Sequence, residues 1–225
     1  MKTLKTLLDE FSGVTPLFPL PDFVFFPKTV QPFHIFEPRY VEMIRDVHAG
    51  EGLLTIPLIK PGTEADERPE FFEIATLGHL HQVQSLEDGS RNILVTGLVK
   101  ASIAEVDSDH AYRRGAITPL AEFGQVADAE GKTQSLLRMF QAVLERSSAT
   151  HNLEILSDGH MPVEMVAHMI IAALPIEVAE KQKMLELQSL DLRINILNNF
   201  LESGLSTLAD IGKFDPIIPS NPLWN

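Results

Sequence analysis

The spacing of apolar residues changes once along this chain of 225 residues, and the change limits the folds open to it. From about residue 15 to 120, apolar residues come in short runs bounded by proline, glycine and aspartate, which is typical of strands. Beyond residue 124 they follow one face of a helix, as in Leu136, Leu137, Phe140, Val143 and Leu144. The pattern predicts an α+β chain in which a β barrel or sandwich precedes a helical part.

We therefore expect a β-rich lobe over residues 1–123, a helical lobe over 124–203 and a proline-rich tail over 204–225. The strongest hairpin signal is Asp88-Gly89, between two apolar runs. The expected strands lie within "TPLFPL", "VFFP", "TVQPFHIF", "GLLTIPLI", "FEIATLGHLHQV" and "RNILVTGLVKASIAEV". The segment "PGTEADERPE", residues 61–70, has no apolar period and is expected to be a solvated loop.

The helical lobe carries clear start and stop signals. One helix is expected from Pro162 to Leu174, because a missing N–H costs nothing at a helix start and Pro175 ends it. "EVAEKQKMLEL" predicts a further helix. Ser189 is positioned to cap "LDLRINILNNFL", which is expected to end before Gly204. The tail "DPIIPSNPLWN" could either dock through Ile217, Ile218 and Trp224 or remain loose.

Composition excludes several classes of protein. The chain has no cysteine, so disulfides and thiolate chemistry are ruled out. Its formal net charge is −13, with the acidic excess in both halves, which disfavours binding to nucleic acid and to anionic membranes. No run approaches the roughly 18 apolar residues of a membrane span. The N-terminal "MKTLKTLLDEFSG" lacks the apolar core and cleavage site of a signal peptide, so we expect a cytoplasmic protein.

The stretch "FPKTVQPFHIFEPRYVEMI", residues 26–44, predicts a strand that turns into a helix at Pro38. Alternation along the strand places Phe33 and Ile35 on one side and Pro32, His34 and Phe36 on the other. One reading makes all the aromatics core, with Arg39 paired to Glu37 or Glu42. The other makes part of the stretch a polypeptide-binding surface, for which we expect Pro32, His34, Phe36, Arg39 and Tyr40.

Four segments are distinctive when taken together: "PLFPLPDFVFFP", "PFHIFEPRYVEMI", "EIATLGHLHQVQSLEDGSRNILVTGLVKASI" and "VAHMIIAALPIEVAEKQKMLELQSLDLRINILNNFL". They resemble the N-terminal, substrate-binding domain of the ATP-dependent Lon proteases. The resemblance covers about residues 15–203. It implies a PUA-like β pseudobarrel followed by a small helical lobe. The sequence contains no G-x-x-x-x-G-K-[ST] loop and no recognisable Ser-Lys peptidase dyad, so we expect a stand-alone, non-catalytic member.

The histidines are the best candidates for other chemistry, and none predicts a site. His79 and His81 share one face of a strand, but the sequence offers no third ligand. His160, Glu164 and His168 have helical spacing without the H-E-x-x-H pattern. The cluster of Asp107, Asp109 and His110 favours a turn. We expect no catalytic residue, no cofactor and no metal.

Three functions remain open. The resemblance favours a module that binds unfolded polypeptides or partner proteins. An RNA-binding PUA-like protein is the first alternative, and the charge opposes it. A small-ligand binder or enzyme with a pocket between the lobes is the second. The sequence leaves the client and the oligomeric state undetermined.

Overall fold

The computed structural model describes residues 3–123, 126–146 and 161–207, with only the backbone described for 144–146 and 204–207. The chain divides into two compact units, Met1–Leu120 and Ala121–Asn225. The sequence-based boundary at residue 123 stays a prediction, and the expected docking of the tail by Ile217, Ile218 and Trp224 lies outside the described residues.

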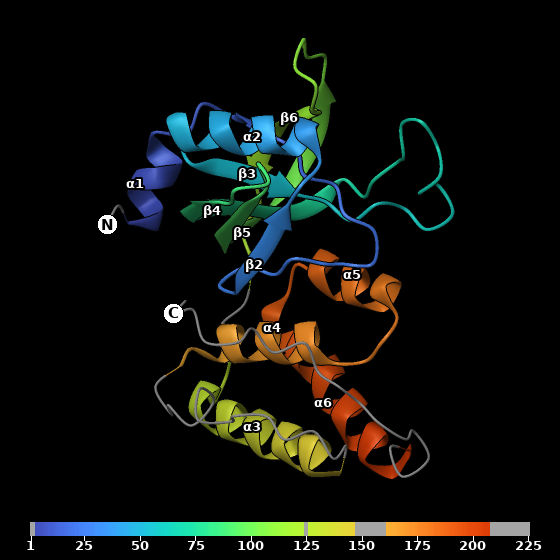
Figure 1. Cartoon of the computed structure of the whole chain (residues 1–225). Helices are drawn as coiled ribbons and strands as arrows, with labels where there is room; N and C mark the ends of the chain where they lie inside the picture. Colours follow the sequence, from blue (N-terminus) through green and yellow to red (C-terminus); the bar gives the residue numbers. More distant parts are fainter. Residues whose placement is uncertain (1–2, 124–125, 147–160, 208–225) are drawn as a thin grey trace. The chain divides into compact units, whose positions relative to one another are not determined.

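The first unit is an antiparallel barrel with two helices (Figure 1). The sheet runs in the order β1-β6-β5-β4-β3, and β2 also pairs with β5. Leu17 next to β1 bridges Thr55 of β3, and the buried hydroxyls of Thr15 and Thr55 lie 2.8 Å apart, so the two ends of the sheet meet. The elements are α1 Leu4–Asp9, β1 Val14–Pro16, β2 Val30–Ile35, α2 Pro38–Ala49, β3 Leu53–Ile56, β4 Ile74–Ser85, β5 Arg91–Val106 and β6 Arg114–Pro119.

The hairpin expected at Asp88-Gly89 is confirmed between β4 and β5. Gly89 has a φ of 86°, a conformation that costs glycine little, and the Asp88 carboxylate accepts a hydrogen bond from the Ser90 N–H at 2.9 Å. The 16-residue β5 pairs with β2 at its start and with β6 at its end, and β4 pairs with it from Arg91 to Ser102. This long strand therefore joins the two sides of the barrel.

Helix α2 begins at Pro38, as the sequence predicts, with Glu37 in extended conformation at its N-cap. Its buried residues Met43, Ile44 and Val47 pack into a core cluster with residues of the strands. Figure 1 shows α2 lying across the strands of this unit. Burial of three apolar side chains on a 12-residue helix fixes its position on the barrel.

Two details of this unit differ from the expectation. "VFFP" does not form a strand, although Val24, Phe25, Phe26 and Pro27 are buried. Its backbone is held in place by other groups, such as the Thr76 hydroxyl, which donates to the Phe25 carbonyl at 2.6 Å. The structure also contains α1, which the sequence reading did not anticipate; its N-cap is Thr3, and it buries Leu7.

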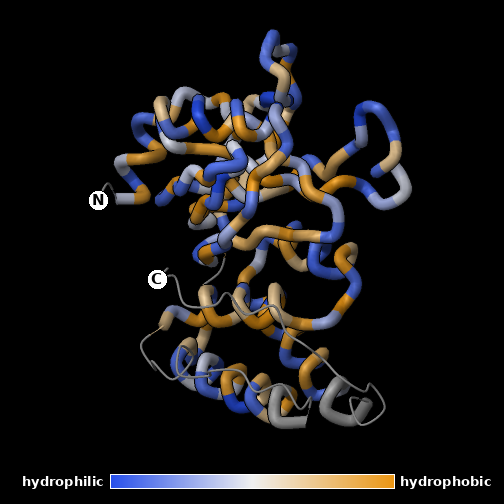
Figure 2. Tube along the Cα trace, in the orientation of Figure 1, coloured by the Kyte–Doolittle hydropathy of each residue, from blue (hydrophilic) through white to orange (hydrophobic). Residues whose placement is uncertain are grey.

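The second unit consists of α3 Ala129–Arg146, α4 Val163–Ala173, α5 Val178–Glu186 and α6 Leu190–Thr207. Leu136, Phe140 and Val143 of α3 are buried, as their spacing predicts. Helix α4 is hydrophobic along most of its length (Figure 2), and α3, α4 and α6 contact one another. Ser189 caps α6 as expected, its hydroxyl accepting from the Leu192 N–H at 3.2 Å.

The predicted end of α6 before Gly204 is wrong, because the helix continues to Thr207. Glycine within a helix costs only about 1 kcal/mol relative to alanine, so the rest of a long helix can override it. Among the helices that the structure describes, none is long and apolar enough to cross a membrane.

Candidate polypeptide-binding surface

The strand β2 alternates as its sequence predicts. Ile35 is buried, and Phe33 packs against the same core cluster, with its ring edge-on to Phe18 at 5.7 Å. On the other side His34 and Phe36 are exposed and Pro32 is half-buried. Among the described strands β2 pairs only with β5, so Pro32 lies in an edge strand, where a missing N–H is tolerated.

Phe36 is the most exposed large hydrophobic side chain among the described residues, with 69% of its surface accessible. The His34 ring stacks beside it, with centroids 6.0 Å apart and an interplanar angle of 27°. His34 is in turn held by Asn92 of β5, whose side-chain oxygen lies 2.9 Å from Nδ1. The aromatic pair therefore projects from a strand whose position is fixed by the sheet.

Arg39 and Tyr40 follow at the start of α2. The Arg39 guanidinium donates two hydrogen bonds to one Glu37 oxygen, at 3.0 and 2.8 Å, and lies 4.7 Å from the centre of the Tyr40 ring. Tyr40 is half-buried, edge-on to Phe18 at 4.8 Å, and burial raises the pKa of its phenol. Tyr40 therefore supports the surface from below, while Arg39 lies on it.

We call Pro32, His34, Phe36, Arg39 and Tyr40 the β2–α2 corner. All five lie within nine consecutive positions at the end of β2 and the start of α2. Three of them, His34, Phe36 and Arg39, are exposed. An accessible phenylalanine beside a guanidinium can bury apolar surface and donate hydrogen bonds to a partner at the same place. Among its five residues the corner contains no nucleophile paired with a base.

The histidine sets considered from the sequence fall into separate environments. His79 and His81 lie edge to face on β4 with ring centroids 4.8 Å apart, and within the described residues no third ligating group joins them. His160 lies outside the described residues. His168 and Glu164 of α4 come together with Glu122, which the sequence pattern did not indicate.

That second group surrounds Arg193 of α6, which is fully buried. Its Nη1 donates to His168 Nε2 at 2.7 Å and its Nη2 to Glu122 at 2.6 Å. Because a guanidinium carries only donors, it already occupies the ligating atoms of both residues. The group is therefore a structural network within the helical unit.

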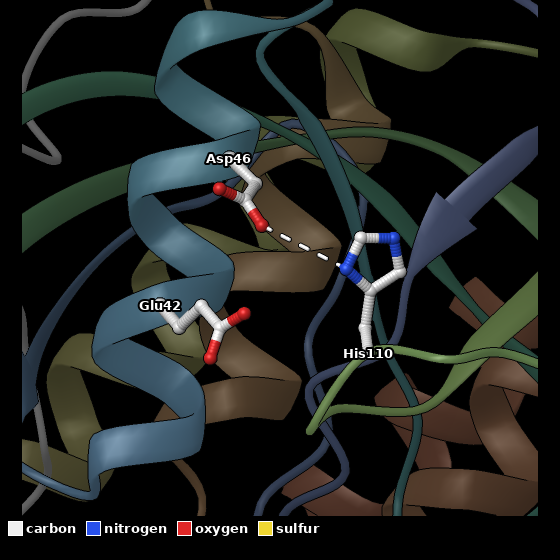
Figure 3. Close-up of side chains that lie close together, drawn as sticks. All are labelled: Glu42, Asp46 and His110. Atoms are coloured by element: carbon white, nitrogen blue, oxygen red, sulfur yellow. Dashed lines mark ion pairs between the residues drawn. The ribbon is translucent and has the colours of Figure 1, made fainter.

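A third group combines Glu42 and Asp46 of α2 with His110 from the loop between β5 and β6 (Figure 3). From the sequence, His110 is expected in a turn with Asp107 and Asp109. Its position near α2 could not be predicted, because the residues that meet here are more than 60 positions apart and no local pattern signals such a contact.

Taken together, the closed barrel and the helical unit define a class of two-part α+β domains, and comparison with known proteins gives the family. The model of the ATP-dependent protease La (LON) substrate-binding domain matches residues 14–203. The chain belongs to this family.

Related sequences and structures agree with this assignment. The Lon protease of Azorhizobium caulinodans is 24% identical over 196 residues, which is 86% of this chain and 23% of that protein. Lon protease 1 of Myxococcus xanthus is 26% identical over 209 residues, 87% of this chain and 25% of that protein. The chain thus spans about a quarter of the length of these relatives.

Two solved structures share the fold. The N-terminal domain of the Mycobacterium avium complex Lon protease has a TM-score of 0.65 at 19% identity, covering 84% of this chain and 98% of that one. The Lon N-terminal domain protein from Xanthomonas campestris has a TM-score of 0.60 at 18% identity, covering 83% and 98%. The α+β fold expected from the resemblance is therefore confirmed.

Proposed function

We propose that this chain is a non-catalytic module that binds unfolded segments of client or partner polypeptides in the cytoplasm, and that the β2–α2 corner is part of the binding surface. The observation that carries the proposal is the exposure of Phe36, 69% accessible in a unit in which Phe18, Phe25 and Phe26 are buried. Aromatic residues and arginine are both enriched at protein interfaces, and Phe36 is exposed close to Arg39.

Burial of Phe36 would make a sizeable contribution to the free energy of binding. A phenylalanine side chain presents about 200 Å² of surface, so covering the exposed part of Phe36 would remove roughly 140 Å² from water. At about 25 cal/mol per Å² this contributes about 3 kcal/mol before ordering costs. Phe36 directly follows β2 and stacks on His34, so its side chain is already ordered before a partner binds. The entropy cost of ordering it on binding is therefore small.

The family description supports polypeptide as the partner. The matching model is that of a substrate-binding domain, and the related sequences are proteases, whose substrates are polypeptides. A net charge of −13 opposes nucleic acid as the partner, because phosphate backbones would be repelled. An extended, apolar segment able to place a side chain against Phe36 and a carbonyl or carboxylate against Arg39 fits the corner best.

Fluorescence anisotropy with a labelled, permanently unfolded polypeptide tests the proposal. We expect Phe36→Ala to weaken binding at least about fivefold, equivalent to about 1 kcal/mol. Phe123→Ala is the matched control, since Phe123 is also an exposed phenylalanine, 62% accessible, and lies outside the corner. We expect this control to bind as the unchanged protein does.

Thermal unfolding of the same variants separates binding from folding. A Phe36→Ala variant that binds with unchanged affinity would overturn the role of the corner. A salt-sensitive complex with RNA under conditions where the polypeptide does not bind would overturn the choice of partner.

We also expect no hydrolysis of ATP or of the unfolded polypeptide. Turnover that a point substitution in this chain abolishes would contradict the non-catalytic assignment.

A further inference from the structure

In the first unit, two acidic side chains on α2 and one imidazole from a loop distant in sequence lie close together. Glu42 and Asp46 are one helical turn apart and so share a face of α2. His110 reaches them from the loop between β5 and β6 (Figure 3). One ligating atom from each of the three residues lies within 4.8 Å of the others. Two carboxylates and one imidazole are a donor set that divalent first-row metals accept.

The separation of the atoms suits a bridging ion. Asp46 Oδ2 and His110 Nδ1 are 3.9 Å apart, which is too long for a direct hydrogen bond. Two ligand atoms bound to tetrahedral zinc at about 2.0–2.1 Å lie roughly 3.4 Å from each other. A shift of about half an ångström would therefore bring this pair to coordination distance, and Glu42, which is partly exposed, can adjust its rotamer to complete the set.

Tyr112 fixes the orientation of two of the three residues. Its buried hydroxyl donates to Asp46 Oδ2 at 3.0 Å, and its ring stacks on His110 with centroids 4.8 Å apart and planes 19° from parallel. A carboxylate that accepts one hydrogen bond keeps further lone pairs for an ion. Support of this kind behind ligating residues typically strengthens metal affinity.

A cavity beside the group provides room for the remaining ligands. Its volume is about 290 Å³, and its lining includes Asp46, His110, Tyr112 and Glu51. Water molecules in such a space could complete the coordination of an ion held by three protein ligands. This cavity is an observation independent of the spacing of the side chains, and two of the three proposed ligands, Asp46 and His110, line it.

Arg45 competes for the same carboxylates. Its guanidinium lies 3.1 Å from Asp46 Oδ1 and 3.9 Å from Glu42 Oε1. The Arg45 side chain is 63% exposed, and exposed ion pairs contribute little stability, so a divalent ion can displace it into water. Arg45 contacts Asp46 Oδ1, whereas the oxygen nearest to His110 is Oδ2.

We propose that Glu42, Asp46 and His110 bind one divalent first-row transition-metal ion, with Zn²⁺ as the best fit. The imidazole favours Zn²⁺ over Mg²⁺ and Ca²⁺, which prefer an all-oxygen set. Partial exposure of the ligands and competition by Arg45 place the affinity in the micromolar range rather than in that of a structural zinc site.

Isothermal titration calorimetry of the full chain with ZnCl₂, in a buffer that does not bind metal, tests the proposal. We expect one site, at least a tenfold loss of affinity in His110→Ala and a comparable loss in Glu42→Gln. His48→Ala is the matched control, because His48 is an exposed histidine on the same helix outside the group. It should bind within twofold of the unchanged protein.

A second double variant, His79→Ala with His81→Ala, tests the other close histidine pair of the barrel unit. Loss of the site in that variant, with binding retained in His110→Ala, would overturn the proposal. So would a site of equal affinity for Mg²⁺ that is indifferent to His110, or the absence of Zn²⁺ binding at millimolar concentration. Unchanged unfolding temperatures without metal confirm that each variant is folded, and the readout does not depend on client binding.

Discussion

Replacing Arg193 should destabilise the helical unit severely, because its guanidinium joins three helices and one connecting segment. Besides His168 of α4 and Glu122, it donates to the carbonyls of Met184 and Leu187 at 2.7 and 2.6 Å. Those carbonyls lie at the end of α5, where a helix leaves backbone acceptors without intrahelical donors. One buried cation therefore caps α5 and positions it against α4 and α6.

The substitution Arg193→Met keeps most of the aliphatic volume and removes every donor. Removing one partner of a buried ion pair costs about 3–5 kcal/mol, since the other charge remains in a poorly solvated position. Glu122 has 20% of its side chain exposed, so it retains some solvation and the lower part of that range is expected. A loss of about 3 kcal/mol is a large share of the 5–15 kcal/mol that stabilises a typical domain.

Hydrogen exchange followed by mass spectrometry gives the required local readout. Peptides from α4, α5 and α6 should lose protection in Arg193→Met, while peptides from β4 and β5 should exchange as before, because the network lies entirely within the helical unit. Arg45→Met is the control for loss of an arginine, since Arg45 is exposed, and it should change stability by less than about 0.5 kcal/mol.

Two outcomes would refute this reasoning. Some buried ion pairs can be replaced by apolar residues without loss, so an Arg193→Met variant within about 1 kcal/mol of the unchanged protein would show that the network contributes no net stability. Equal loss of protection in both units would show that the effect is not confined to the helical unit. Arg193→Lys keeps the charge but cannot reach all four acceptors. Its stability should therefore lie between that of the unchanged protein and that of Arg193→Met.

Three further predictions concern the barrel unit. Hydrogen bonds from Arg113, opposed by desolvation and assisted by Arg68, lower the pKa of Glu105 from its ordinary value of 4.5 to about 2. Between these two values the folded state binds fewer protons than the unfolded state. The stability that Glu105 contributes is therefore fully present above about pH 4.5 and is lost as the pH falls toward 2. In urea unfolding, Glu105→Gln should lower the free energy of unfolding by about 1–2 kcal/mol at pH 7, a figure reduced because Glu105 is partly exposed, and by much less at pH 2.5. An equal loss at the two pH values would contradict this prediction. Phe25→Ala should lower the free energy of unfolding by about 3–5 kcal/mol in the same measurement, whereas Phe36→Ala should lower it by about 1 kcal/mol or less, because only Phe25 is buried. Similar losses in the two variants would mean that Phe36 belongs to the core. Gly97→Ala should cost at least about 2 kcal/mol, since the added Cβ would lie 2.3 Å from the Phe26 carbonyl oxygen, and a neutral effect would mean that this backbone approach relaxes freely.

The sequence predicts best where a single element carries its own signal. The Asp88-Gly89 turn, the Pro38 helix start and the Ser189 cap were each set by local chemistry, and each is confirmed. The alternation in β2 likewise anticipated that Phe33 and Ile35 share one side of the strand and His34 and Phe36 the other, but it left open which side is buried. In these places local preference and tertiary packing agree, so the pattern alone was sufficient.

The errors arise where tertiary contacts decide the outcome. An apolar run such as "VFFP" has the composition of a strand, but Phe25 and Phe26 are buried as irregular chain. The close approach of the Phe26 carbonyl to Gly97 requires a residue without a side chain some 70 positions away. The Arg193 network and the meeting of Asp46 with His110 also depend on long-range folding. Periodicity describes how one element is buried and carries no information on which distant groups it will contact.

The helix α2 connects the two proposed sites and allows a final prediction. Phe36 and Arg39 lie at or next to its N-terminal end, while Glu42 and Asp46 lie roughly 6 Å and 12 Å along its axis from Pro38, at about 1.5 Å per helical residue. Because Met43, Ile44 and Val47 hold the helix against the core, a bound ion would neutralise carboxylates without moving the corner. Coupling between two sites needs an element with two states that both ligands bias, and the buried face of α2 offers no second position. Saturating Zn²⁺ should therefore change the affinity for the unfolded polypeptide by less than about twofold. A larger change that disappears in His110→Ala would show that α2 moves, and that the two sites act together.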